Sequence, residues 1–162
     1  MNNTRIQVAP RRRKSPPWYS SWPVLVYRLH LGWMMGGQFM LVSHRGRQTG
    51  KLRQTGVMVL RHDRAARQVY VVAGSTAADW YRNIQAAPAE EIQVGRERYR
   101  PIQSFLSTAE VADLLEWSRK CHPLQARLQA LFFGWPWKAD RARLLTLAAS
   151  FGGVAFRPAN PT

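Results

Sequence analysis

The sequence has little cysteine and little acid. It contains one cysteine, Cys121, and nine acidic residues among 162. A single cysteine excludes an intramolecular disulfide framework and every zinc site that needs several cysteines. The apolar stretch from Trp18 to Val42 is interrupted by Arg28, His30 and Gly36-Gly37, which argues against a membrane span and a secretory signal. Because a chain of this length can bury a core unaided, we expect a metal-free domain in a reducing, cytoplasmic setting.

Acidic residues are missing altogether from the first 62 positions, so the net charge of +15 is unevenly placed. The sequence has no carboxylate before Asp63. The same stretch carries eleven cations: Arg5, Arg11, Arg12, Arg13, Lys14, Arg28, Arg45, Arg47, Lys51, Arg53 and Arg61. Such a segment faces an anionic partner or stays solvated. Nucleic acid, an acidic membrane surface and a polyanionic ligand are the three candidates.

Two regions differ in composition. Residues 1–17 contain Arg11-Arg12-Arg13-Lys14 and then Ser15-Pro16-Pro17 without apolar periodicity, which predicts a flexible basic N-terminal arm. Residues 18–162 have the apolar content of one globular domain. The tryptophans and tyrosines that follow the arm are also typical of an interfacial membrane anchor, although we favour core packing.

Turn-forming and helix-capping residues, together with the spacing of apolar residues, predict short strands followed by helices. A first helix is expected from Ser20 or Ser21 to Gly36-Gly37, and a short one from a capping Asp79 to before Pro88. Ser107-x-x-Glu110 is a capping box that starts a third helix. Further apolar helical faces are expected at Leu124, Leu128, Leu131 and Phe132, and at Leu144, Leu145 and Leu147. The expected strands are Phe39 to Ser43, Leu52 to Leu60, Val69 to Ala73, Ile92 to Val94, Arg98 to Phe105, and Val154 to Phe156.

The order of these elements indicates an α+β fold. Strands and helices do not alternate as a doubly wound sheet requires. We therefore expect an antiparallel barrel or sheet, with a helix before it and peripheral helices after it.

The connection between the first two strands carries the most chemistry. It runs from His44 to Arg53 with the sequence HRGRQTGKLR. Two glycines and a threonine allow successive backbone N–H groups to converge on an anion, and the cations add charge. An equally good interpretation is a hairpin turn kept soluble by Arg and Lys. Arg53 and Thr55 are two residues apart on a strand, so they share a face.

Several runs together resemble a known family. The segments RLHLGWMMGGQFMLVSHRGRQTGKLRQT, VYVVAG and DWYRNIQAAP with IQVG look like the nitroreductase family of deazaflavin-dependent oxidoreductases. The resemblance covers roughly residues 24 to 105. It implies a split β-barrel like those that bind FMN, and coenzyme F420 as the cofactor, with FMN as the alternative.

The resemblance also implies which residues hold the coenzyme. The loop and the strand after it match the phosphate and tail site, where neighbouring cations and Thr55 join the candidates: Arg45, Arg47, Gln48, Thr49, Gly50, Lys51, Arg53 and Thr55. The later strand end matches the segment beside the deazaflavin ring: Val72, Ala73, Gly74 and Ser75. A short segment matches the part that closes over the coenzyme: Asp79, Trp80, Tyr81 and Asn83.

The implied activity is hydride transfer from the reduced deazaflavin to a hydrophobic acceptor such as a quinone, an enone or a nitroaromatic. The coenzyme carries this chemistry, so the protein needs no nucleophile, and we identify no catalytic residue. The four histidines are scattered and are expected to be surface or capping residues. Cys121 is expected to be a partly buried structural residue.

Two other functions stay open at this point. One is a barrel that binds FMN, haem or a lipid without turnover, and the other is a basic protein that binds nucleic acid or an anionic membrane. The resemblance weakens the case for nucleic acid, because it assigns the cations around Gly50 to a small anionic coenzyme. The arm leaves peripheral contact with the inner face of the membrane open, and the sequence allows a monomer or a homodimer.

Overall fold

The computed structural model describes residues 37–124, 126–127 and 139–159. The expected first helix and the basic arm lie outside these residues. Of the expected face formed by Leu124, Leu128, Leu131 and Phe132, only Leu124 lies inside them. Three helices are described in full, α2 (Asp79–Ala86), α3 (Thr108–Cys121) and α5 (Arg141–Ala148). None of the helices in these ranges is long and apolar enough to cross a membrane.

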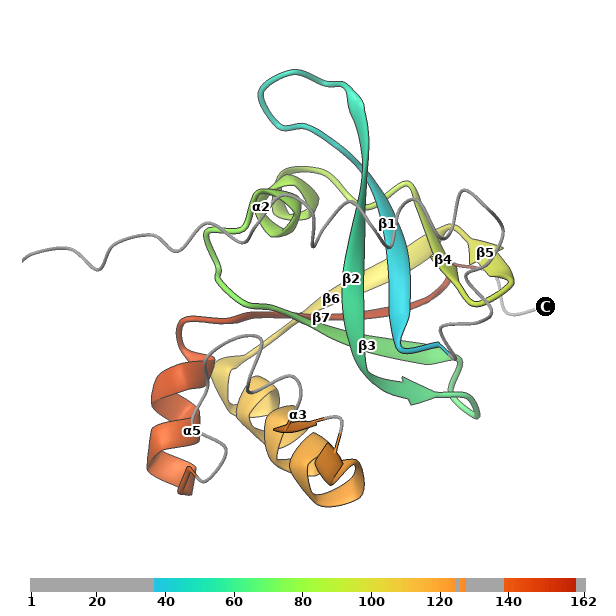
Figure 1. Cartoon of the computed structure of the whole chain (residues 1–162). Helices are drawn as coiled ribbons and strands as arrows, with labels where there is room; N and C mark the ends of the chain where they lie inside the picture. The colour runs from blue at the N-terminus through green and yellow to red at the C-terminus, as the bar shows by residue number, and fades with distance from the viewer. Residues whose placement is uncertain (1–36, 125, 128–138, 160–162) are drawn as a thin grey trace, which may run out of the picture.

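The strands form one antiparallel sheet that curls on itself (Figure 1). Its order is β5-β4-β1-β2-β3-β7-β6. The strands are β1 (Phe39–Arg45), β2 (Leu52–Asp63), β3 (Gln68–Ala73), β4 (Glu91–Val94), β5 (Glu97–Tyr99), β6 (Pro101–Leu106) and β7 (Gly152–Pro158). Because β5 and β6 lie at opposite ends of that order but are separated only by Arg100, the sheet must curl until its two edges approach each other. This arrangement confirms the predicted split barrel of the α+β class.

The two faces of the curled sheet bury different cores. Val69 and Val71 of β3 point into the barrel, where they pack with Met40, Val42, Ile92 and Phe156. Tyr70 and Val72 alternate with them and point outward, against α3 and α5. α3 therefore lies against the outside of β2, β7 and β6 with α5 packed beside it, whereas α2 lies at another end of the barrel, next to β1 (Figure 1).

Two adjacent glycines at the start of β7 allow both cores to pack closely. A Cβ atom at Gly152 would clash with the ring of Tyr81 from α2. A Cβ atom at Gly153 would lie 2.5 Å from a methyl group of Val111 in α3. The two faces of one strand thus hold α2 and α3 in place.

The structure confirms several predicted elements and corrects others. Ser107 and Glu110 form the expected capping box, with both reciprocal hydrogen bonds present. The prediction of one strand from Arg98 to Phe105 was wrong. The strand is interrupted at Arg100, and a new strand starts at Pro101, because a proline has no N–H to continue a ladder of hydrogen bonds. Cys121 is exposed rather than partly buried, since it ends α3 on the solvent side.

Candidate functional site

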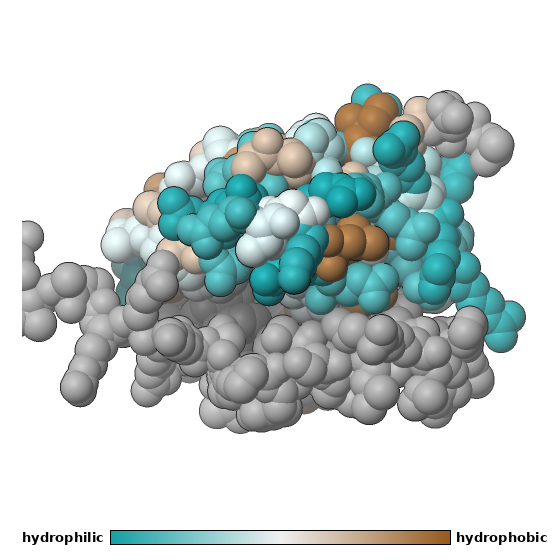
Figure 2. Space-filling view, turned by 90° about the horizontal axis from the view of Figure 1, so that it is seen from above, coloured by the Kyte–Doolittle hydropathy of each residue, from teal (hydrophilic) through white to brown (hydrophobic). Residues whose placement is uncertain are grey.

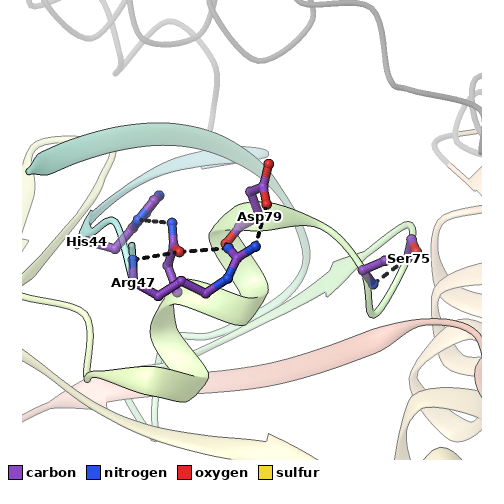
Figure 3. A network of polar contacts seen from close by, with 6 residues as sticks. His44, Arg47, Ser75 and Asp79 are labelled. Carbon is purple, nitrogen blue, oxygen red and sulfur yellow. Dashed lines mark hydrogen bonds and ion pairs between the residues drawn. The ribbon is translucent and has the colours of Figure 1, made fainter. Parts of the chain in front are cut away.

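α2 is attached to the β1–β2 loop by one arginine. Arg47 donates from its guanidinium to the backbone oxygen of Asp79 at 3.4 Å and to the Asp79 carboxylate at 3.0 Å. It also donates to Oδ1 of Asn83, from the guanidinium at 2.9 Å and from its backbone N–H at 3.1 Å. Two of the segments that the sequence assigned to one site are therefore in direct contact (Figure 3).

The contact with Asp79 corrects its predicted role. Asp79 is the first residue of α2, and the N-cap is Ala78, whose side chain cannot accept a hydrogen bond. A carboxylate in the first turn still interacts favourably with the helix dipole. Its partner is Arg47 of the loop instead of the N–H groups of its own helix.

Beneath this contact lies a buried polar group that the sequence did not reveal. His44 is 2% exposed, so the expectation of a surface or capping residue was wrong. Its Nδ1 lies 3.2 Å from Nδ2 of Asn83, and its Nε2 lies 3.0 Å from Oγ1 of Thr55. Alternation along β1 was the available signal, because Met40, Val42 and His44 fall on one face.

The loop backbone does not form the predicted cradle of free N–H groups. The N–H of Gly46 donates to the Lys51 oxygen, and those of Thr49 and Gly50 both donate to the Gly46 oxygen. With the Arg47 N–H bound to Asn83, these four donors are all used within the chain. The turn is thus closed by its own hydrogen bonds, and side chains remain to bind an anion.

The side chains of the loop supply that positive charge. Arg45 pairs with Glu90 and donates to the Gly50 oxygen, so its charge is partly neutralised. Lys51 and Arg53 are exposed, and neither has an assigned carboxylate partner among the described residues. Arg53 lies close to the loop, since a Cβ atom on Gly46 would be 3.3 Å from its Nε. Seen from above, the described surface is mostly hydrophilic with isolated apolar residues (Figure 2).

The end of β3 and the start of α2 form the apolar side of the candidate site. Gly74 and Ser75 follow β3 and are exposed, and the Ser75 hydroxyl accepts from the Ala77 N–H at 3.1 Å. Trp80 is half-buried, and its ring meets that of Tyr81 edge-on with centroids 5.8 Å apart. Tyr81 is buried and anchors α2 in the barrel core, where burial raises the pKa of its phenol.

The remaining predicted site residues fall into an exposed group and a buried group. Gln48, Thr49 and Gly50 are exposed at the tip of the β1–β2 loop. Val72 and Ala73 are buried in the two cores, so only the residues after them are accessible to a ligand. The structure therefore brings the loop and α2 together, with the end of β3 leading into the helix.

Comparison with protein-family models decides the identity of the chain. Residues 26–130 match the model described as F420H(2)-dependent quinone reductase. The chain belongs to this family. It is an F420-dependent reductase, and the family implies coenzyme F420 as its cofactor. The coarser part of the predicted resemblance is thereby confirmed, while the nitroreductase label stays a prediction.

Comparisons with individual proteins add little to the family assignment. No curated protein sequence matches the chain. A solved structure described as an F420-H2 dependent reductase (FDR-A) has 17% identity and a TM-score of 0.47, covering 74% of this chain and 94% of that chain. A pyridoxamine 5'-phosphate oxidase-related, FMN binding protein from Nostoc punctiforme has 18% identity and a TM-score of 0.46, covering 88% of this chain and 81% of that one.

The residues of the candidate site match the chemistry of F420 in charge and in aromatic character. F420 carries a phosphodiester and a γ-glutamyl tail, which are anionic, and a flat deazaflavin ring. Lys51 and Arg53 offer cations without a carboxylate partner among the described residues. Trp80 is half-buried and offers part of an aromatic surface, and the backbone at Gly74 is exposed.

Proposed function

We propose that the chain binds F420 across the β1–β2 loop, the end of β3 and α2, and transfers a hydride to a hydrophobic acceptor. The observation that carries the proposal is the attachment of α2 to the loop through Arg47 and Asn83. That attachment joins a cationic surface to an aromatic one. A coenzyme with an anionic tail and an aromatic ring needs a cationic surface and an aromatic surface that are no farther apart than the length of the coenzyme.

The loop side would hold the phosphate and the tail. Lys51 and Arg53 supply the charge, with Arg45 and Arg47 adding to it where Glu90 and Asp79 do not neutralise them. The exposed side chains of Gln48 and Thr49 are further donors at the loop tip.

The α2 side would hold the ring. Bound F420 in its reduced form supplies the hydride. The chain would orient that ring against Trp80 and the exposed backbone at Gly74 and Ser75. Tyr81 and Ile84 hold α2 in the core, so the aromatic surface is fixed before the coenzyme arrives.

Fluorescence titration with F420 tests the binding half of the proposal. We expect saturable quenching or enhancement at micromolar coenzyme. Arg53→Gln should weaken binding, whereas Arg64→Gln in the β2–β3 turn should leave it unchanged, because that turn lies at the far end of β2. No spectral change at micromolar F420 would contradict the proposal.

The acceptor is tested separately, with reduced F420 in excess and oxygen excluded. A quinone, an enone and a nitroaromatic are each supplied at equal concentration, and F420 oxidation is followed by its absorbance. The family's description supports the quinone as the preferred acceptor. Equal, background-level rates with all three compounds would overturn the hydrophobic-acceptor assignment.

We also propose that the protein contacts the anionic inner face of the cytoplasmic membrane. It is supported by the five cations of residues 1–17. Co-sedimentation of the full chain with anionic and neutral vesicles, with and without residues 1–17, tests it. Binding that is independent of lipid charge, salt or the arm would overturn it.

A further inference from the structure

His44 is a buried titratable residue that hydride transfer itself does not require. It lies on the inner face of β1, beneath the contact between the β1–β2 loop and α2 (Figure 3). Both of its ring nitrogens have polar partners, Asn83 on one side and Thr55 on the other. A buried imidazole with two assigned partners is held in one orientation.

The partners determine which ring nitrogen carries the hydrogen. The backbone N–H and the guanidinium of Arg47 can only donate, so the Asn83 atom that faces them is the oxygen. The NH2 group of Asn83 must then face His44 and donate to Nδ1. Nδ1 therefore carries a lone pair, and the neutral imidazole has its hydrogen on Nε2. That hydrogen is donated to Oγ1 of Thr55.

This assignment leaves the hydroxyl hydrogen of Thr55 available. Its oxygen already accepts from His44, and the described part of the chain provides no assigned acceptor for its hydrogen. Thr55 pairs with Val42, and Arg53 pairs with His44, in the β1–β2 ladder. Directly opposed residues share a face of the sheet, so Arg53, Thr55 and His44 lie on the same face, next to the loop.

Burial is the main reason why His44 favours its neutral form. Burial lowers the pKa of His44 below its ordinary value of 6.5, a backbone hydrogen bond with Arg45 opposes this, and the charge of Arg53 lowers it further. From the loop, Arg47 faces the other side of Asn83. From α2, the carboxylate of Asp79 is directed to Arg47. Glu90, just before β4, is directed to Arg45.

We propose that His44 is a positioning residue, held as the Nε2–H tautomer, that fixes Asn83 under Arg47 and turns the Thr55 hydroxyl hydrogen toward an anionic oxygen of F420. The proposal rests on the proposed function for its ligand. The tautomer itself follows from the hydrogen bonds within the chain. One imidazole thus connects the attachment of α2 to the arrangement of donors on the anion-binding face.

Nitrogen-15 NMR of the histidine side chains tests the tautomer without any coenzyme. His44, assigned by its absence in His44→Gln, should show a protonated Nε2 and an unprotonated Nδ1, and it should titrate below free histidine. A protonated Nδ1 at neutral pH would overturn the proposal.

A matched pair of amide-to-carboxylate variants tests the role of Asn83. Asn83→Asp replaces the donor to Nδ1 by an acceptor, so the proton should move to Nδ1 and the pKa of His44 should rise. F420 affinity should fall at least tenfold. Gln85→Glu adds the same charge at an exposed position of α2 and should change neither the tautomer nor the affinity. Equal effects of the two variants would overturn the role of Asn83.

Thr55 distinguishes this proposal from the proposed function. Thr55→Val removes the hydroxyl at constant shape and should weaken F420 binding about tenfold. Thr55→Ser should restore most of that affinity. Wild-type affinity in Thr55→Val would overturn the positioning role alone. A wild-type protein that does not bind F420 would overturn the proposed function, and the coenzyme part of this inference with it.

Discussion

Asn83 accepts two hydrogen bonds from Arg47, at 3.1 Å from the backbone N–H and at 2.9 Å from the guanidinium, although 36 residues separate them. One buried carboxamide therefore fixes both the backbone of the β1–β2 loop and the side chain that reaches α2. The side chain at the N-cap of α2 makes no hydrogen bond, so this contact also fixes the position of the N-terminal end of α2. The loop and α2 should consequently loosen together when the contact is weakened.

Replacing Arg47 by lysine tests this coupling. Lysine keeps the charge but loses the planar fork that reaches Asp79 and Asn83 at once. We expect faster hydrogen exchange at the amides of both α2 and the loop, with F420 binding several-fold weaker. Arg64→Lys, in the β2–β3 turn, is the matched control and should change neither. Faster exchange in the loop alone would show that α2 is held independently.

The packing of Tyr81 against Gly152 predicts a stability effect. Gly152→Ala would place a methyl group inside the contact distance of the Tyr81 ring, and the ring cannot retreat without moving α2. We expect a loss of about 1–3 kcal/mol in the free energy of unfolding, measured by denaturant titration. In Tyr81→Leu the same substitution should cost less, because the clash is gone. Additive losses would contradict this explanation.

Gln103 predicts a second stability effect at the underside of α2. Its Oε1 accepts from the Ala89 N–H at 2.9 Å, and its Nε2 donates to the Ile84 oxygen at 2.8 Å. Gln103→Leu leaves both backbone groups unpaired and should destabilise the protein by about 1–3 kcal/mol. Gln103→Glu keeps only the bond from the Ala89 N–H, so the free energy of unfolding that it loses should differ from the amount lost in Gln103→Leu. Ser104→Ala, exposed on the same strand, is the control.

The histidines predict how stability depends on pH. Burial lowers the pKa of His44 and of His62, so the unfolded chain binds more protons near pH 6.5 than the folded chain. Stability should therefore fall as the pH drops through 6.5. His44→Gln and His62→Gln should each reduce this slope, as measured by denaturation between about pH 5.5 and 7.5. An unchanged slope in His44→Gln would show that His44 does not titrate abnormally.

Sequence patterns were sufficient for the elements and not for the contacts between them. Short apolar runs rich in β-branched residues predicted the strands, and Ser107-x-x-Glu110 predicted the start of α3, because both signals are local. The break at Pro101 was missed because strand-forming residues lie on both sides of it, Tyr99 before it and Ile102 and Phe105 after it. The contact of Asp79 and the hydrogen bond of His44 to α2 depend on Arg47 and Asn83, which lie elsewhere in the chain. Such long-range polar contacts leave no periodicity in the sequence.

Arg53 provides the sharpest prediction about the loop. It shares the inner face of the sheet with His44, packs beside Gly46, and has no assigned carboxylate partner in the described ranges. Its charge should therefore serve the coenzyme rather than the fold. Arg53→Gln should weaken F420 binding roughly tenfold and reduce the dependence of affinity on salt, with the free energy of unfolding nearly unchanged.

The same variant has a second readout that a purely structural arginine would not move. Because the charge of Arg53 lowers the pKa of His44, Arg53→Gln should raise that pKa in the NMR titration while the Nε2–H tautomer persists. Arg64→Gln removes an equal charge at the far end of β2 and should affect neither F420 affinity nor His44. If Arg53→Gln instead lowers stability and leaves affinity intact, the cation belongs to the fold, and the tail of F420 must be bound by Lys51 and the remaining loop residues.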